Sequence, residues 1–154
     1  MELQIIFQLL LAVFLGGLVG CERELKRKQA GLQTYSLVAL GSCLFTKLAF
    51  EFFNNFLVKS GINFDPSRVI QAVAIGIGFI GAGVIFFRGA DRIEGLTTAA
   101  GLWIVAAIGI AVGANFYFLA VFATFLTIGI LAGLGLLEEK IFKIITNSPP
   151  RKIK

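Results

Sequence analysis

The sequence contains no histidine, and only 15% of its 154 residues are charged. Without histidine, the chain lacks the general base of Ser-His-Asp and Cys-His catalysis and the commonest proton acceptor near pH 7. No other pair of a nucleophile and a base stands out, so no catalytic residue is assigned and an enzyme is not expected. An ordinary soluble domain carries roughly 25% charged residues, so the low charge argues against a soluble fold.

Cysteine is also scarce, with only Cys21 and Cys43 in the chain. They lie at the end of the first apolar run and inside the second, which disfavours a disulfide, and their spacing fits no common metal site. Both are interpreted as small buried hydrophobic residues. The N-terminus has neither a basic region nor a cleavage site, so no cleavable signal peptide is expected.

Apolar residues, in contrast, make up 57% of the chain and form long runs. A helix that spans a membrane needs roughly 20 mostly apolar residues, with about 17 to 25 tolerated. We therefore expect an all-α membrane protein with a five-helix transmembrane domain at residues 1–140 and a basic cytoplasmic tail at residues 141–154. The predicted spans are Leu3–Cys21, Tyr35–Phe53, Val69–Phe87, Thr97–Val112 and Phe116–Leu137.

Basic residues are distributed unevenly among the connections between these spans. Of the 14 lysines and arginines, 11 fall in the first and third connections and in the tail, which share one side of a five-span protein. Cytoplasmic loops carry an excess of lysine and arginine, so the N-terminus is predicted outside and the C-terminus in the cytoplasm. This placement indicates contact with lipid headgroups, and no basic stripe interleaved with aromatic residues suggests nucleic acid.

Glycine and alanine recur at three- and four-residue spacing within the predicted spans. Glycine costs about 1 kcal/mol relative to alanine in a helix, so its repetition indicates a packing role, and helices in lipid associate through such residues. The third span has small residues on two faces and is expected to be central. One such face could join two copies of the chain as a homodimer. The predicted packing glycines are Gly16, Gly20, Gly76, Gly78, Gly81, Gly83, Gly129 and Gly133.

Polar residues gather at the predicted cytoplasmic ends of the spans. The short connection between the third and fourth spans brings two helix ends together, so its charges could cluster with those that follow the first span. Thr97 or Thr98 is expected to cap the fourth span. Such a cluster would bind a cation, an anion or a protein partner; alternatively, its charges are solvated and only enforce topology. The candidate residues are Glu22, Arg23, Arg88, Asp91, Glu94, Thr97 and Thr98.

Other polar residues lie inside the spans, where such residues are functional candidates by default. Arg68 and Gln71 open the third span, and Gln71 is expected to find a partner on a neighbouring helix. Trp103 is expected to pack between helices. Lys47 and Glu51 form an i, i+4 pair that is expected to neutralise itself, with the lysine reaching outward.

Several segments occur in the order seen in one group of bacterial membrane proteins. They are Gly16-x-x-x-Gly20-x-Glu22-Arg23-Glu24, Gly31-Leu-Gln-Thr34, Gly41-Ser42, Arg68-x-x-Gln71, Gly76-Ile-Gly-Phe-Ile-Gly-Ala-Gly83 and Gly95-Leu-Thr-Thr-Ala-Ala-x-x-Trp103. Together they resemble the MgtC/SapB family over residues 12–130. The resemblance implies a protein of the bacterial inner membrane associated with magnesium limitation, acid stress and, in pathogens, survival inside host cells. It also implies a regulator rather than a proven carrier.

The chain departs from the family pattern in two places. Where the family often has Gly-Leu-Arg-Thr-His, this chain has Gln33 and Tyr35, so no role of that basic pair carries over. Several members also have a soluble C-terminal domain, which is not expected here.

The function expected from the sequence is that of a non-enzymatic membrane regulator in magnesium homeostasis or stress adaptation, which binds partner membrane proteins. The alternative is a small transporter or channel for Mg²⁺ or another ion. Because Mg²⁺ takes oxygen ligands and releases its water reluctantly, a cation path needs carboxylates deep in the bundle, whereas the acidic residues here lie at span ends or in loops. No cofactor is expected. Mg²⁺ is considered only as a ligand, with Glu22 and Glu94 as weak candidates.

Overall fold

The computed structural model describes residues 2–53, 65, 67–88 and 92–134. Within this part of the chain, five helices are long and apolar enough to cross a membrane, which confirms the predicted all-α membrane fold. The orientation of the termini stays a prediction. The helices are α1 (Glu2–Leu25), α2 (Leu32–Phe52), α3 (Ser67–Val84), α4 (Leu96–Gly113) and α5 (Tyr117–Gly129), which continues into a π-helical turn at Ile130–Leu134.

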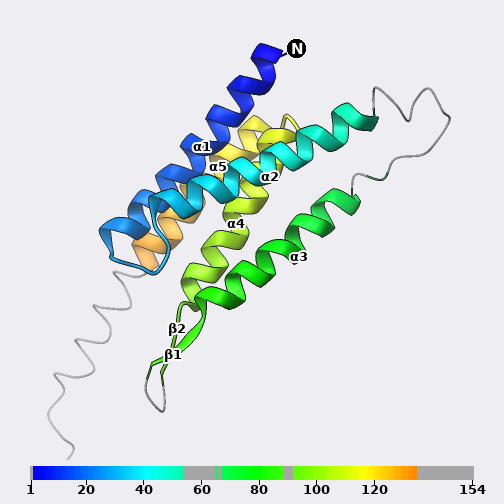
Figure 1. Ribbon diagram of the computed structural model, residues 1–154. Helices are drawn as coiled ribbons and strands as arrows, with labels where there is room; N and C mark the ends of the chain where they lie inside the picture. The colour runs from blue at the N-terminus through cyan, green and yellow to red at the C-terminus, as the bar shows by residue number, and fades with distance from the viewer. Residues whose placement is uncertain (1, 54–64, 66, 89–91, 135–154) are drawn as a thin grey trace, which may run out of the picture.

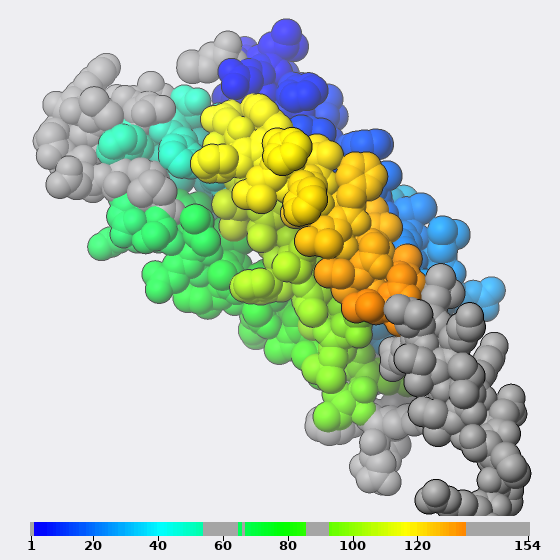
Figure 2. Space-filling model, turned by 180° about the vertical axis from the view of Figure 1, so that it is seen from behind, coloured from blue at the N-terminus to red at the C-terminus, as the bar shows by residue number. Residues whose placement is uncertain are grey.

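Helix α4 lies at the centre of the bundle and contacts the other four helices (Figure 1). Helices α1 and α2 pack along each other, and α5 covers α1 and α4 on the opposite face (Figure 2). Helix α3 lies at the edge and packs mainly on α4. Half of the α4 span is buried, against 11% of the α3 span. The prediction that the third span is central is therefore wrong, and the fourth span has that position.

Close packing of α2 on α4 explains the central position of α4. A Cβ atom added at Gly109 would overlap the carbonyl oxygen of Ala39, and one added at Gly113 would lie 2.8 Å from the carbonyl oxygen of Cys43. Only glycine permits so close an approach of two backbones, and this approach increases van der Waals contact where lipid gives no hydrophobic driving force.

The predicted packing glycines fall into two groups. On α1, a Cβ at Gly16 would lie 2.6 Å from Ala39 Cβ, and one at Gly20 would lie 2.8 Å from Leu32 Cα, so both glycines pack against α2. On α3, Gly81 is in ordinary contact with Ala99 of α4, at 3.4 Å. The other five have no heavy atom within 4 Å of an added Cβ, so they pack against no helix in the described part of the chain. These five are Gly76, Gly78, Gly83, Gly129 and Gly133.

The connection between α3 and α4 is a hairpin, whereas the sequence predicted that the third span continues to Phe87. Strand β1 (Phe86–Arg88) pairs antiparallel with β2 (Arg92–Glu94), and Phe87 faces Ile93 in the register. The aromatic and β-branched residues of β1 and β2 favour a strand over a helix. Asp91, between the two strands, lies outside the described residues.

Gly95 ends the hairpin and leads into α4. Its φ is 92°, a conformation that glycine adopts readily, and a Cβ there would overlap the carbonyl oxygen of Val84. Because α4 begins at Leu96, Thr97 and Thr98 lie in its first turn and no side chain caps it. The predicted threonine cap is therefore wrong.

The outward faces of the helices carry large apolar side chains, as expected where lipid is the solvent. Trp103 is one of them, with 54% of its surface exposed, so the prediction that it packs between helices is wrong. Its neighbour Leu102 is fully buried, and one residue step turns an α-helix by about 100°. Cys43 is buried as predicted, whereas Cys21 is exposed.

Candidate functional site

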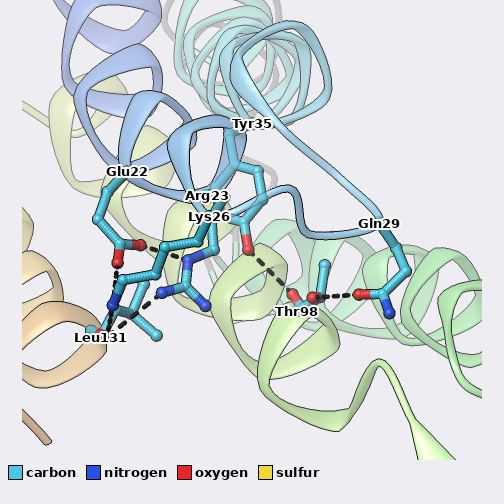
Figure 3. A network of polar contacts seen from close by, with 7 residues as sticks. All are labelled: Glu22, Arg23, Lys26, Gln29, Tyr35, Thr98 and Leu131. Carbon is cyan, nitrogen blue, oxygen red and sulfur yellow. Dashed lines mark hydrogen bonds and ion pairs between the residues drawn. The ribbon is translucent and has the colours of Figure 1, made fainter. Parts of the chain in front are cut away.

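Three charged residues near the end of α1 meet the π-helical turn that follows α5 (Figure 3). We call Glu22, Arg23, Lys26 and the carbonyl group of Leu131 the Arg23 cluster. The Arg23 side chain is only 2% exposed, and its Nε donates a hydrogen bond to Glu22 Oε2. The Lys26 Nζ lies 2.8 Å from Glu22 Oε1, and the Lys26 side chain remains 35% exposed. Both carboxylate oxygens of Glu22 therefore face a cation.

The carbonyl oxygen of Leu131 accepts hydrogen bonds from a side chain of α1 and from one just after its end. Arg23 Nη2 donates at 3.3 Å and Lys26 Nζ at 2.9 Å. Carbonyl groups near the C-terminal end of a helix carry partial negative charge, which favours cations beside them. Short π-helical segments, such as the one that contains Leu131, often occur at functional sites. The cluster thus ties two helices together that are far apart in sequence.

Burial of the Arg23 guanidinium needs a compensating charge, because the desolvation of an ion costs several kcal/mol. Glu22 supplies that charge, and its i, i+4 arrangement with Lys26 is the favourable orientation on a helix. One carboxylate and two cations leave a net charge of +1 on these side chains. The cluster therefore suits an anionic group or an acidic partner surface better than a metal cation.

A second set of polar contacts lies beside the cluster and joins α2 to α4 (Figure 3). The Tyr35 hydroxyl donates to the carbonyl oxygen of Thr98 at 3.1 Å, and Thr98 Oγ1 donates to Gln29 Oε1 at 3.0 Å. Tyr35 and Thr98 are both buried. A Cβ added at Gly20 would lie 2.9 Å from Tyr35 Cβ, so the missing side chain at that position admits Tyr35 next to α1.

The connection between α1 and α2 is held by local hydrogen bonds. The backbone of Arg27 has a φ of 50°, which turns the chain, and Lys28 N donates to the carbonyl oxygen of Arg23 at 3.0 Å. Glu24 Oε2 then accepts from Leu32 N at 3.0 Å, which satisfies a free backbone donor at the start of α2. These contacts fix the positions of Arg23 and Gln29 relative to α2.

The structure places the predicted polar candidates in three groups. Glu22, Arg23 and Thr98 belong to the contacts described above. Thr97 is exposed, and Glu94 is half-buried at the end of β2. Asp91 and the side chain of Arg88 lie outside the described part of the structure. The prediction that the hairpin charges join Glu22 and Arg23 therefore stays a prediction.

Sequence reasoning missed Lys26, Gln29 and Tyr35 as neighbours of the candidate site. The i, i+4 spacing of Glu22 and Lys26 was a signal in the sequence, but it is meaningful only if the helix continues beyond Cys21, where the predicted span ended. In the structure, α1 continues to Leu25. Gln29 lies in a connection and Tyr35 on the inner face of α2, and neither position carried a signal of polar contact.

The polar candidates inside the spans form fewer contacts than predicted. Arg68 and Gln71 are exposed on α3, and the side chain of Gln71 makes no hydrogen bond with the described residues. Its predicted partner on a neighbouring helix is therefore not found in this part of the chain. Lys47 is 9% exposed and forms no ion pair with Glu51, although both residues are described. The predicted neutral pair is wrong.

A polar contact at the other end of the bundle involves Gln8, which is fully buried on α1. Its Nε2 lies 3.2 Å from the carbonyl oxygen of Val112, 2.6 Å from Asn115 Oδ1 and 2.8 Å from the Tyr117 hydroxyl. The Tyr117 hydroxyl also donates to Asn115 Oδ1 at 2.9 Å. Gln8 thus ties α1 to the turn between α4 and α5, where Asn115 has a φ of 67°.

The described residues contain no group of three or more histidine, cysteine, aspartate or glutamate side chains that could hold a metal ion. Glu22, one of the two weak candidates for Mg²⁺, has both oxygens next to cations. Binding of Mg²⁺ there would have to displace Arg23 or Lys26, so the geometry disfavours it.

Comparisons with known proteins give a consistent result. The model of the MgtC family matches residues 9–140. An "Uncharacterized protein" of Haemophilus influenzae is 46% identical over 124 residues, which are 80% of this chain and 52% of that protein. "Putative magnesium transporter YhiD" of Escherichia coli K12 is 40% identical over 131 residues (85% and 60%), and "Protein MgtC" of Brucella abortus is 41% identical over 121 residues (79% and 47%). The chain therefore spans about half of the length of these relatives. No solved structure matches it.

Proposed function

Because the chain belongs to the MgtC family and is a multi-pass protein of the bacterial plasma membrane, we propose that it acts in magnesium homeostasis or stress adaptation as a non-enzymatic regulator. It would do so by binding a partner membrane protein at the end of the bundle that carries the Arg23 cluster. The observation that supports this proposal is the net positive cluster, in which Lys26 remains 35% exposed beside a buried ion pair.

The alternative function is transport of Mg²⁺ or another ion, which the name of the Escherichia coli relative suggests. The buried interior gives this alternative little support. Its polar side chains lie near the two ends, with Gln8 and Lys47 at one and Arg23 and Thr98 at the other, or bond to carbonyl groups of their own helix. The hydroxyl groups of Thr46 and Thr124, for instance, donate to the carbonyl oxygens four residues earlier, at 2.8 Å each. Between the ends, the described core is mostly apolar.

The experiment that separates the two functions combines growth and flux. Lys26→Gln removes the exposed cation of the cluster, and Lys28→Gln removes another lysine of the same connection, whose side chain forms no hydrogen bond or ion pair with the described residues. Glu22→Ala is less suitable, because it leaves the buried Arg23 without its counter-charge.

If regulation depends on the cluster, Lys26→Gln impairs growth under magnesium limitation while Lys28→Gln grows like the wild type. The purified wild-type protein in liposomes then gives no Mg²⁺ flux above that of empty liposomes. Protein-dependent Mg²⁺ flux would establish the transporter alternative instead. Equal growth of Lys26→Gln and wild type would remove the cluster from the proposed function.

A further inference from the structure

A groove with a volume of about 820 Å³ runs between α2 and α3, the two helices at the front of Figure 1. Its walls are almost entirely apolar. Leu37 and Phe45 line it on α2, and Ala72 and Ile80 line it on α3. The hydroxyl of Ser42 also borders the groove, but it is satisfied by the carbonyl oxygen of Val38 at 2.8 Å.

Two glycines widen this groove, one on each wall. Gly41 on α2 and Gly76 on α3 both border it, and a Cβ at either position would have no heavy atom within 4 Å. The open space at Gly76 is therefore the space of the groove itself. A side chain added there would occupy the groove without displacing a neighbouring helix.

The length of the groove matches one leaflet of a bilayer. On α3 it extends from Arg68 to Ile80. Twelve residues at a rise of about 1.5 Å give roughly 18 Å. One leaflet accounts for about half of a hydrocarbon core of roughly 30 Å. An extended acyl chain therefore has the length and the apolar character that the groove requires.

Arg68 places a positive charge at one end of this apolar surface. It is exposed in the first turn of α3 and forms no salt bridge with the described residues. The N-terminal end of a helix adds partial positive charge. The carboxylate of Asp65 offsets part of it, since Asp65 Oδ1 accepts a hydrogen bond from Ser67 N at 2.9 Å. The guanidinium retains five donors, which match phosphate geometry.

We propose that the groove between α2 and α3 binds an anionic phospholipid, with one acyl chain along Gly41 and Gly76 and the phosphate at Arg68. The chemistry at the two parts of the groove supports this occupant: an apolar trough one leaflet long opens toward lipid, and a cation lies at its end. A second copy of the chain could also cover the apolar walls of the groove. To match Arg68 as well, the surface of that second copy would have to carry an anionic group at the end of the groove where Arg68 lies.

Native mass spectrometry of the purified full chain tests this proposal. The protein is mixed with equal amounts of phosphatidylglycerol and phosphatidylcholine, and the lipid retained by each variant is measured. Gly76→Leu fills the groove. Gly78→Leu is its matched control, because Gly78 lies on the same helix in equally open space but does not border the groove. Arg68→Gln removes the charge, with Lys28→Gln as its control.

We expect the wild type to retain phosphatidylglycerol in preference to phosphatidylcholine. Gly76→Leu should lose several-fold in retention of both lipids, while Gly78→Leu behaves like the wild type. Arg68→Gln should bring the two lipids to parity without abolishing retention. Equal retention by wild type and Gly76→Leu would refute the proposal. So would a lipid-free wild-type dimer that Gly76→Leu converts to a monomer, because a second copy would then occupy the groove.

Discussion

The hydroxyl group of Tyr35 lies against the α carbon of Gly101, so that a Cβ at Gly101 would overlap it. The same hydroxyl donates to the carbonyl oxygen of Thr98, one turn earlier on α4. Tyr35 is thus held by α4 through a hydrogen bond and through a close contact that only glycine allows. We therefore expect the two positions to be coupled energetically.

We expect Tyr35→Phe to lower the free energy of unfolding by about 1 kcal/mol, because one buried hydrogen bond is lost. Gly101→Ala should destabilise the protein more strongly, because its methyl group meets the Tyr35 hydroxyl. In the double variant that hydroxyl is absent, so the combined loss should be smaller than the sum of the single losses. A double-mutant cycle measured by unfolding in detergent micelles checks this coupling. Strictly additive losses would show that the two positions do not interact.

The buried ion pair gives a second prediction. Arg23→Gln leaves the carboxylate of Glu22 with only Lys26 as a counter-charge, and loss of one partner of a buried pair costs about 3–5 kcal/mol. The double variant Glu22→Gln/Arg23→Gln leaves neither member of this buried pair charged and should be more stable than Arg23→Gln alone. Thermal unfolding of the purified variants measures the order. Lys28→Gln, at an exposed position, serves as the control and should unfold like the wild type.

At the other end of the bundle, we expect Gln8→Leu to lower the unfolding free energy by about 0.6–1.7 kcal/mol, which are the average and the maximum measured for hydrogen bonds between membrane helices. The variant loses the contacts with Asn115 and Tyr117. Gln4→Leu makes the same chemical change at an exposed position of the same helix. A Gln4→Leu variant as unstable as Gln8→Leu would contradict this assignment.

Glycine positions that look alike in the sequence should respond differently to alanine. Gly109→Ala brings a methyl group onto the carbonyl oxygen of Ala39, so we expect a marked loss of folded protein. Gly129→Ala enters open space and should be neutral or stabilising, by up to about 1 kcal/mol, from helix propensity alone. The yield of monodisperse protein on size-exclusion chromatography compares the two. Equal yields would show that α2 and α4 can separate without cost.

The start of α3 should respond to acid. The hydrogen bond from Ser67 holds the pKa of the Asp65 carboxyl below its ordinary value. A lowered pKa means that Asp65 stabilises this end of α3 above the unfolded pKa of about 3.9, and that the contribution is lost as the pH falls through the lowered pKa. A titration of the ¹³C carboxyl signal in nanodiscs should give a midpoint below 3.9 for Asp65. A midpoint at or above that value would exclude the hydrogen bond.

The five spans could be predicted because each needs only a sufficiently long apolar run. The order of packing could not, since both the third and the fourth span carry small residues. The fourth is central because Gly109 and Gly113 meet the backbone of α2, whereas Gly76 and Gly78 meet nothing in the described chain. Which glycine faces a backbone depends on the partner helix, and a helical wheel of one span does not contain that information.

The candidate site, like the fold, could be predicted only in part. Glu22 and Arg23 were found because charges near or inside a membrane are functional candidates by default. Their partner Leu131 could not be found, because it contributes a backbone carbonyl, which every residue possesses. Lys26 was missed because the helix was expected to end at Cys21, whereas it continues to Leu25, directly before Lys26. A single additional turn of α1 was therefore enough to change the composition of the site.

The contact between Arg23 and Leu131 also sets an order of assembly. The two residues are 108 positions apart in the chain. At roughly 5–20 residues per second, synthesis needs about 5 to 20 s to pass from one to the other. Until the fifth span has entered the membrane, Arg23 and Lys26 lack this acceptor. The polar contacts at the end of the first helix are therefore completed only when the fifth span arrives, and until then its two cations are paired with Glu22 alone.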